Sequence, residues 1–282
     1  MALLTVNNLT LPLNGITKLD NISFSLHPGV RVALLGASGS GKSLNARALL
    51  GLPLAGSTMS GDIHFSGQNR VAQQPRIAAI FQDTSAALHP LIGVGKQLVL
   101  TLRASGATSA RAAWKAGVRL LATVGFSQPE HIAYRYPDEL SGGQRQRVCI
   151  ALALASQSAL LIADEPTTAL DVITQAQVLQ ALKAYTSRAP ERALLFITHD
   201  IAVAAALCQR ALILYDGKIV EQGTIDALVR HPQHPYTVAL MTTARQQRQQ
   251  VSQNTLALRG KVRCVLLHCT EPQRPLFWRC VR

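Results

Sequence analysis

The residues Arg31-Val-Ala-Leu-Leu-Gly36-Ala-Ser-Gly-Ser-Gly-Lys42-Ser43 decide the fold of this chain. The run from Arg31 to Leu35 predicts a buried strand, and a helical pattern begins at Lys42. Between them stands G-x-x-x-x-G-K-S, whose glycines let the backbone wrap a phosphate while N–H groups and the helix N-terminus attract the anion. A plain Gly/Ser turn is the alternative, but the flanking strand and helix stand in the order that a phosphate loop needs.

This loop predicts defined contacts with a nucleotide. Lys42 is expected to reach the β- and γ-phosphates, and Ser43 to offer a hydroxyl to Mg²⁺, a hard ion that prefers oxygen ligands. The residues predicted to bind the nucleotide here are Gly36, Ala37, Ser38, Gly39, Ser40, Gly41, Lys42 and Ser43.

On either side of the loop, short apolar runs alternate with helical patterns. Such alternation predicts an α/β fold with a largely parallel sheet and helices on both faces. The predicted strands are Arg31 to Leu35, Ile77 to Phe81, Ala159 to Ala163, Ala193 to Thr198 and Ala211 to Tyr215. The predicted helices in this part are Lys42 to Gly51, Val172 to Arg188 and Ile201 to Gln209.

Two regions depart from this alternation. An antiparallel β-subdomain is predicted from the segments Leu3 to Leu11, Ile22 to Leu26 and Gly61 to Ser66. From Gly93 to Pro137 helical patterns replace the strand signal, so we predict an α-helical subdomain of about residues 93–155 inserted into the sheet domain. Residues 1–244 are expected to form one ATPase-like domain, and residues 245–282 a basic, poorly ordered tail.

An apolar strand that ends in Asp164 and Glu165 supplies two carboxylates at the carboxyl edge of the sheet, where open α/β sheets bind ligands. Asp164 is expected to hold Mg²⁺. Glu165 is the candidate to orient or deprotonate an attacking water opposite the leaving phosphate. An acidic pair at a strand end is usually a solvated turn, and the upstream phosphate loop is what favours the catalytic interpretation.

The sequence Leu140-Ser-Gly-Gly-Gln144 precedes a long helical run and predicts a second anion site. Ser141 can cap the helix while the N–H groups of Gly142 and Gly143 face outward. Two such sites in one chain have a simple explanation if two copies pair head to tail, each closing over the nucleotide of the other. A capped helix start without a ligand is the alternative.

Two further polar residues follow predicted strands. His199 ends Ile-Thr-His199-Asp and is placed to donate a hydrogen bond to the γ-phosphate. Gln82 follows Ile80-Phe81 and is placed to touch Mg²⁺ or water where the helical insertion begins. The predicted catalytic residues are therefore Glu165, His199 and Gln82, and the predicted metal ligands are Ser43, Gln82 and Asp164.

Composition limits the other functions. The formal charge is +13, but residues 245–282 hold eight basic groups against Glu271 alone, so the tail accounts for much of the excess. No nucleic-acid-binding motif accompanies it, and nucleic acid is not an expected partner. Five cysteines without disulfide-like spacing fit a reducing compartment. No secretory signal and no apolar run long enough to span a membrane is visible, so a cytosolic location is expected.

Taken together and in order, these motifs resemble the ATP-binding subunits of ABC transporters over roughly residues 3–244. The resemblance rests on the loop Gly36 to Ser43, Gln82, Leu140 to Gln144, Asp164-Glu165, Ala169-Leu170-Asp171 and His199. It implies ATP and Mg²⁺ as cofactors, ATP hydrolysis as the activity, and a dimer of ATPase subunits. It also implies that Ser141 and Gly143 of one subunit contact the γ-phosphate held by the other, and that Asp171 lies at the interface. Gly142 and Gln144 of the same motif, and Asp171, are likewise expected to bind the nucleotide.

Within that family, several segments are similar to the oligopeptide, dipeptide and nickel importers. They are Phe81-Gln-Asp83, Leu88-His-Pro90, Ala163 to Asp171, Lys218 to Gly223 and His234-Pro-Tyr-Thr237. The short β-subdomain and Lys42-Ser43-Leu44 favour the nickel branch. The partners implied are a second ATPase subunit, two membrane permease subunits and an extracytoplasmic solute-binding protein, with this chain on the cytoplasmic face of the inner membrane.

Three features depart from the family pattern. The family usually has an aromatic residue in the first β-subdomain that stacks on adenine, but no Phe, Tyr or Trp occurs before Phe24. Leu11, Leu13 or Ile16 would take the place of that residue. Thr168 stands where serine is usual. Cys264, Cys269 and Cys280 resemble only loosely the cysteine-rich extension that binds an iron–sulfur cluster in relatives. Two rival functions stay open: a soluble ABC-type ATPase acting on nucleic acid or ribosomes, and a regulatory subunit with little hydrolysis.

Overall fold

A computed structural model describes residues 1–52, 56–66, 77–84, 87–107, 109–244 and 246. The chain divides into two compact units, Met1–Val238 and Ala239–Arg282, and every element named below lies in the first. The basic tail and its three cysteines lie outside the described residues, except for Gln246. The boundary at residue 244 and the extent of the helical subdomain stay predictions.

The antiparallel β-subdomain predicted from the sequence is present. Its three strands are β1 (Leu4–Leu13), β2 (Ile16–Leu26) and β4 (Ser60–Phe65), in the order β2-β1-β4. A two-residue turn joins β1 to β2, and both of its residues, Asn14 (φ 51) and Gly15 (φ 77), take the left-handed backbone that such tight hairpins require.

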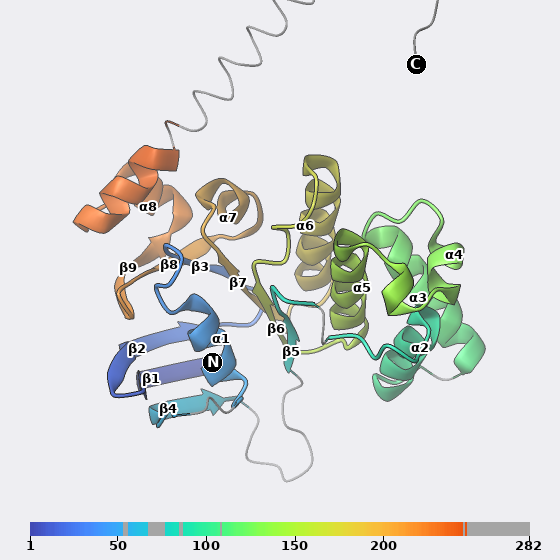
Figure 1. Ribbon diagram of the computed structural model, residues 1–282. Helices are drawn as coiled ribbons and strands as arrows, with labels where there is room; N and C mark the ends of the chain where they lie inside the picture. The colour runs from blue at the N-terminus through green and yellow to red at the C-terminus, as the bar shows by residue number, and fades with distance from the viewer. Residues whose placement is uncertain (53–55, 67–76, 85–86, 108, 245, 247–282) are drawn as a thin grey trace, which may run out of the picture. The chain divides into compact units, whose positions relative to one another are not determined.

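A six-stranded sheet forms the centre of the unit, with the order β5-β6-β7-β3-β8-β9 (Figure 1). Its strands are β3 (Arg31–Leu35), β5 (Ile77–Ile80), β6 (Leu160–Asp164), β7 (Ala193–Thr198), β8 (Arg210–Tyr215) and β9 (Lys218–Thr224). Five strands are parallel, and β9 pairs antiparallel with β8. The strand that leads into the phosphate loop, β3, therefore lies between β7 and β8.

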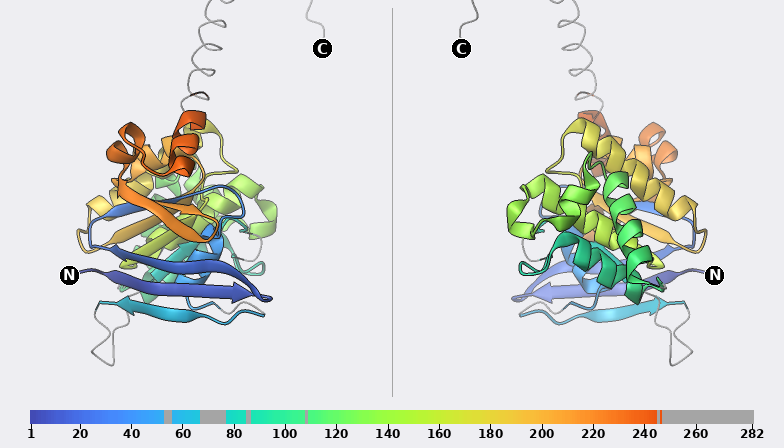
Figure 2. Two further views of the ribbon diagram at one scale, coloured as in Figure 1. Left: turned by 90° about the vertical axis from the view of Figure 1, so that its left-hand side faces the viewer. Right: turned by 90° about the vertical axis from the view of Figure 1, so that its right-hand side faces the viewer.

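Helices cover this sheet and connect its strands. They are α1 (Lys42–Leu49), α2 (Val94–Ala104), α3 (Ala110–Thr123), α4 (Pro129–Tyr134), the 3₁₀ turn η1 (Pro137–Glu139), α5 (Gly142–Ala155), α6 (Val172–Ser187), α7 (Ile201–Leu207) and α8 (Ile225–Arg230). Figure 1 shows α1 between the two sheets, and the right-hand view of Figure 2 shows α3, α5 and α6 on the opposite side of the unit from β1 and β2. No helix in the described ranges is long and apolar enough to cross a membrane.

The hydrophobic core joins both sheets through α1. Leu4 and Leu9 of β1, Ala46 of α1 and Leu34 of β3 are all fully buried in one cluster. Because α1 is packed on both sides, the loop that precedes it is anchored at its helical end as well as at its strand end.

Phe196 in β7 is a large side chain with no exposed surface. Removing a buried phenyl ring costs the transfer free energy of the ring plus the energy of the cavity left behind. We expect Phe196→Ala to lower the free energy of unfolding by about 3–5 kcal/mol. Urea denaturation of the full chain measures this. A loss below about 0.5 kcal/mol, the range of ordinary surface substitutions, would mean that β7 is not the buried centre of the sheet.

Candidate nucleotide-binding site

The predicted phosphate loop lies between β3 and α1. Gly39 (φ 80) and Gly41 (φ 103) take left-handed backbone conformations that other residues rarely adopt. At Gly36 the constraint is space, since a Cβ atom there would clash with the carbonyl oxygen of Leu214 in β8. The glycines of the motif are therefore required by the loop's own backbone, before any ligand is considered.

Lys42 folds back over this loop. Its Nζ donates to the carbonyl oxygens of Gly36 at 2.9 Å and Ala37 at 2.8 Å. Burial lowers the pKa of the Lys42 ammonium, and the negative charges of Glu165 and Asp164 oppose that shift. The Lys42 ammonium therefore interacts electrostatically with both predicted acids, Asp164 and Glu165. Its N–H groups donate to backbone carbonyls of the phosphate loop itself.

Asp164 and Ser43 form the part of the site that fits Mg²⁺. Burial raises the pKa of the Asp164 carboxyl, and a hydrogen bond with the Ser43 hydroxyl opposes that rise. Oδ1 of Asp164 is buried and has no hydrogen-bond partner among the described residues. Hard oxygen donors with one unpartnered carboxylate oxygen suit a hard cation that keeps waters and phosphate oxygens as its other ligands. No group of three His, Cys, Asp or Glu side chains in the described part of the chain could hold a metal by itself.

Glu165 and His199 meet because their strands are neighbours. Ile197 of β7 pairs with Asp164 of β6, and the residues that follow bring His199 Nδ1 to 3.0 Å from Glu165 Oε1. The Glu165 side chain is 13% exposed and that of His199 is 60% exposed. Glu165 also has φ 46, a strained backbone for a residue with a side chain, of the kind found at functional sites.

Gln82 lies at the same edge of the sheet. Ile80 at the end of β5 is opposite Ala163 of β6, so Gln82 follows its strand beside the strand that ends in Asp164. Gln82 is exposed, and its side chain makes no hydrogen bond with any described residue. Its role toward Mg²⁺ or water stays a prediction.

Ser141 and Gln144 cap the start of α5 in the single chain. The Ser141 hydroxyl accepts from the Gln144 N–H at 3.3 Å, and the Gln144 side-chain oxygen accepts from the Ser141 N–H at 3.0 Å. A hydroxyl that accepts one bond keeps its own proton to donate. Capping the helix and donating to a phosphate are therefore compatible roles for Ser141, and among the described residues no hydrogen bond joins its side chain to the chain's own phosphate loop.

The two glycines of this motif differ in their surroundings. A Cβ at Gly143 would lie 3.3 Å from the carbonyl oxygen of Ala169, whereas one at Gly142 would meet no atom within 4 Å. No contact with the described residues therefore requires glycine at Gly142.

We expect Gly142→Ala to separate stability from activity. Alanine is a better helix former than glycine by up to about 1 kcal/mol, so the melting temperature should stay or rise. ATP hydrolysis should fall about ten-fold or more if a partner's nucleotide must approach Gly142 closely, because misplacement by about 1 Å can cost 100-fold in rate. A thermal melt and a phosphate-release assay on one preparation test both points, and full activity would mean that nothing approaches this position.

Asp171 caps α6, with Oδ1 accepting the N–H groups of Ile173 at 3.1 Å and Thr174 at 3.0 Å. Hydrogen bonds from the backbone and hydroxyl of Thr174 lower the pKa of the Asp171 carboxyl. This local role explains the residue without a partner, so its place at a subunit interface stays a prediction.

The structure shows one contact near the site that no pattern in the sequence predicted. Gln146, a buried residue of α5, donates from Nε2 to the carbonyl oxygen of Glu165 at 3.4 Å. The helix that begins with the second anion motif thus contacts the backbone of the predicted catalytic acid in the same chain. Its helical pattern gave no sign that Gln146 faces β6.

The structure narrows the choice of a residue to contact adenine. Leu11 lies in the core and is only 2% exposed, so it cannot contact a base. Ile16, at the start of β2, is 59% exposed. Leu13 is partly buried against the core and pairs with Ile16 across the hairpin. Ile16 is therefore the better placed of the three to contact a base with its aliphatic surface.

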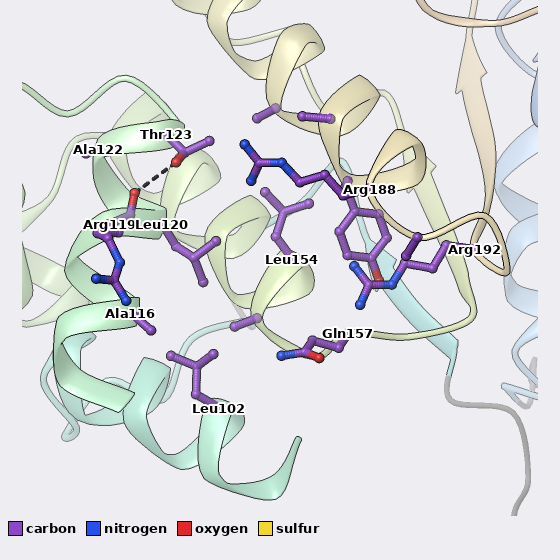
Figure 3. Close-up of a pocket in the computed structure, with 15 residues that line it drawn as sticks. Leu102, Ala116, Arg119, Leu120, Ala122, Thr123, Leu154, Gln157, Arg188 and Arg192 are labelled. Carbon is purple, nitrogen blue, oxygen red and sulfur yellow. Dashed lines mark hydrogen bonds between the residues drawn. The ribbon is translucent and has the colours of Figure 1, made fainter. Parts of the chain in front are cut away.

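A hollow of about 710 Å³ lies elsewhere on the unit, between the ends of α2, α3, α5 and α6 (Figure 3). Leu120 and Leu154 form part of its apolar wall, and Arg119, Arg188 and Arg192 contribute its positive charge. None of the predicted site residues lines it. The predicted residues Asp164, Glu165 and His199 instead lie at the carboxyl edge of the parallel strands.

These features define a nucleotide-binding α/β protein with a phosphate loop, an acidic strand end and an inserted helical layer. The family model described as ABC transporter matches residues 19–168. The chain belongs to the ABC transporter family, as the motifs in its sequence indicated, and is an ATP-binding cassette of that family.

Curated relatives support the same assignment. The chain is 41% identical over 239 residues to the oligopeptide transport ATP-binding protein OppD of Bacillus subtilis, covering 81% of this chain and 66% of that protein. It is 37% identical over 252 residues to OppD of Haemophilus influenzae, covering 85% and 78%. It is 41% identical to the glutathione import ATP-binding protein GsiA of Escherichia coli, covering 82% of this chain but only 40% of that longer protein.

Solved structures agree with the fold. An ATP-binding cassette described as a dimer in a post-hydrolysis state with ADP and Pi superimposes with a TM-score of 0.67 at 28% identity, covering 79% of this chain and 98% of that one. The ATP-binding subunit of an ABC transporter gives a TM-score of 0.69 at 25% identity, covering 86% and 99%. The predicted α/β cassette with its β-subdomain and helical insertion is thereby confirmed.

Proposed function

We propose that this chain hydrolyses ATP to ADP and phosphate as the motor subunit of an importer. The observation that carries the proposal is the hydrogen bond between Glu165 and His199 beside Lys42 and Asp164. It supports the proposal because a candidate base and its polar neighbour lie close to the candidate phosphate-binding cation Lys42 and the candidate metal ligand Asp164. Mg²⁺, held by Ser43, Asp164 and Gln82, would neutralise phosphate charge. The chain's own residues bind the phosphates, orient water and accept its proton.

The nucleotide site is proposed to be completed by a second ATPase subunit. Gly142 stands in open space and Ser141 retains a proton to donate, as a motif that meets another subunit's nucleotide requires. The dimer described for the solved cassette with ADP and Pi has the same fold, which supports the arrangement. The proposal is the same for a second copy of this chain and for a related chain. The two cases differ only in the partner's residues that face Ser141.

The membrane partners follow from the relatives. Proteins named for oligopeptide transport and glutathione import share about two-fifths of their residues with this chain over most of its length. We propose two permease subunits, an extracytoplasmic solute-binding protein, and a location at the cytoplasmic face of the membrane. Those relatives' names favour a peptide-type solute. Lys42-Ser43-Leu44 and the short β-subdomain favour a nickel complex as the alternative.

Affinity purification of the tagged full chain from detergent-solubilised membranes tests the partnership. Polytopic membrane proteins should copurify in amounts close to the chain's own, whereas recovery with ribosomes or nucleic acid would contradict an importer. The purified assembly, reconstituted in vesicles, should take up solute only when ATP is supplied on the side of this chain. Labelled oligopeptides and labelled Ni²⁺, offered with the solute-binding protein, distinguish the two solute classes. The Glu165→Gln assembly is the matched control, because it should assemble without transporting.

A further inference from the structure

A tyrosine far along the chain contacts the phosphate loop directly. The backbone N–H of Ala37 donates to the hydroxyl oxygen of Tyr236 at 2.7 Å, across 199 positions of sequence. The carbonyl oxygen of the same Ala37 accepts from Lys42 Nζ at 2.8 Å. Both polar groups of this residue are thus held, one by the lysine expected to bind phosphate and the other by Tyr236.

Tyr236 is itself held in place. Its ring packs on that of Tyr215 at the end of β8, with 4.4 Å between centroids and an interplanar angle of 32°. Its N–H donates to Nδ1 of His234 at 3.2 Å. The Glu221 carboxylate in β9 accepts the N–H groups of Gln233 and His234, each at 3.0 Å.

The neighbouring turn supports the same side of the loop. The N–H of Gly217, between β8 and β9, donates to the carbonyl oxygen of Ser40 at 3.2 Å. The segment from β8 to Tyr236 therefore forms hydrogen bonds with the loop at Ala37 and at Ser40. A loop whose exposed residues depend on such contacts loses affinity for an anion when the contacts are removed, because its N–H groups must be aligned before they bind.

We propose that Tyr236 is a positioning residue of the nucleotide site, whose hydroxyl holds the start of the phosphate loop in the shape that binds ATP. It acts through Ala37 and does not touch the reacting atoms. Glu221 supports the same arrangement by fixing the two residues that precede Pro235. The role concerns this chain's own nucleotide pocket and is independent of the solute carried.

The test compares Tyr236→Phe with Tyr215→Phe in the full chain. Each variant removes one hydroxyl and keeps both rings, but only the Tyr236 hydroxyl contacts the loop. Tyr236→Phe should raise the Kd for ATP and the KM about three- to ten-fold, the range that loss of one neutral hydrogen bond supports. Its kcat at saturating ATP should stay within about two-fold of the wild type, since the loop reaches its working shape once ATP is bound. Tyr215→Phe should match the wild type in both.

A double-mutant cycle distinguishes positioning from general support. Glu221→Gln keeps one oxygen to accept from Gln233 or His234, but it places an NH₂ group against the N–H of the other residue. In the chain that has Tyr236, this variant should therefore bind ATP more weakly. In the Tyr236→Phe background, Glu221→Gln should cause no further rise in the Kd for ATP. If the two substitutions acted independently, their effects on the free energy of binding would add. In the absence of nucleotide, Tyr236→Phe and Tyr215→Phe should have the same melting temperature.

Equal Kd values for the two hydroxyl variants, or tighter binding by Tyr236→Phe than by the wild type, would overturn the proposal. If Tyr236→Phe does not fold, Glu221→Gln alone decides. An unchanged Kd for ATP in that variant would then remove the role assigned to this contact.

Discussion

The Glu165→Gln variant is expected to bind ATP with nearly normal affinity and to hydrolyse it about 10²- to 10⁴-fold more slowly, the range that a positioned general base contributes. Glutamine has the shape of glutamate, so the short contact with His199 can persist as a neutral hydrogen bond. What is lost is the negative charge that accepts a proton from water. Single-turnover phosphate release and nucleotide binding, measured on one preparation, separate the two effects.

A second result should accompany this loss of turnover. If ATP holds two subunits together and hydrolysis releases them, the variant should accumulate as an ATP-bound dimer, visible by light scattering. The exposed Glu130 at the start of α4 gives the control, since Glu130→Gln makes the same chemical change away from the site. Phosphate release by Glu165→Gln at the rate of that control would remove Glu165 from the role of base.

The Lys42→Ala variant should lose affinity for ATP by about 100-fold or more. Charge-assisted hydrogen bonds contribute about 1.5–3 kcal/mol each, and Lys42 is expected to make them to two phosphates. In the structure the same ammonium donates to the carbonyl oxygens of Gly36 and Ala37. Its removal therefore also loosens the loop, so the loss should be larger than phosphate contacts alone would give.

Isothermal titration with ATP and with ADP measures this change, and Lys96→Ala in α2 is the matched control because that lysine is exposed. The loss should be greater for ATP than for ADP if Lys42 reaches the γ-phosphate as well as the β-phosphate. Equal losses would restrict it to the β-phosphate. A Kd for ATP close to that of Lys96→Ala would contradict its place in the site.

The buried parallel strands were the part of the fold most open to prediction. Arg31 to Leu35 and Ala193 to Thr198 match β3 and β7, because strands covered on both faces need continuous apolar side chains. The start of β2 was missed, since Ile16 to Lys18 are exposed and Asn21 (φ 53) interrupts the alternation. The edge strand β9 was not predicted as a strand, because its polar residues resemble a loop.

For the site, local patterns predicted residues that follow strands or begin helices. Lys42, Asp164 and Glu165 are of this kind, since each stands at a fixed offset from an apolar run. Gln146 and Tyr236 are not, because their contacts join residues distant in the chain and depend on how α5 packs and on how the segment after α8 returns. Periodicity carries no information on such contacts.

The pairing of β6 with β7 has a consequence for how the chain can vary. Glu165 and His199 are 34 positions apart, yet their separation is set by the spacing of two hydrogen-bonded strands. The intervening α6 packs a buried face that includes Val178 and Leu182, but it does not set this separation. The turn between α6 and β7 could therefore vary in length between related proteins without altering the distance across which a proton is handled. Tolerance to change and catalytic precision thus reside in different parts of the same crossover connection.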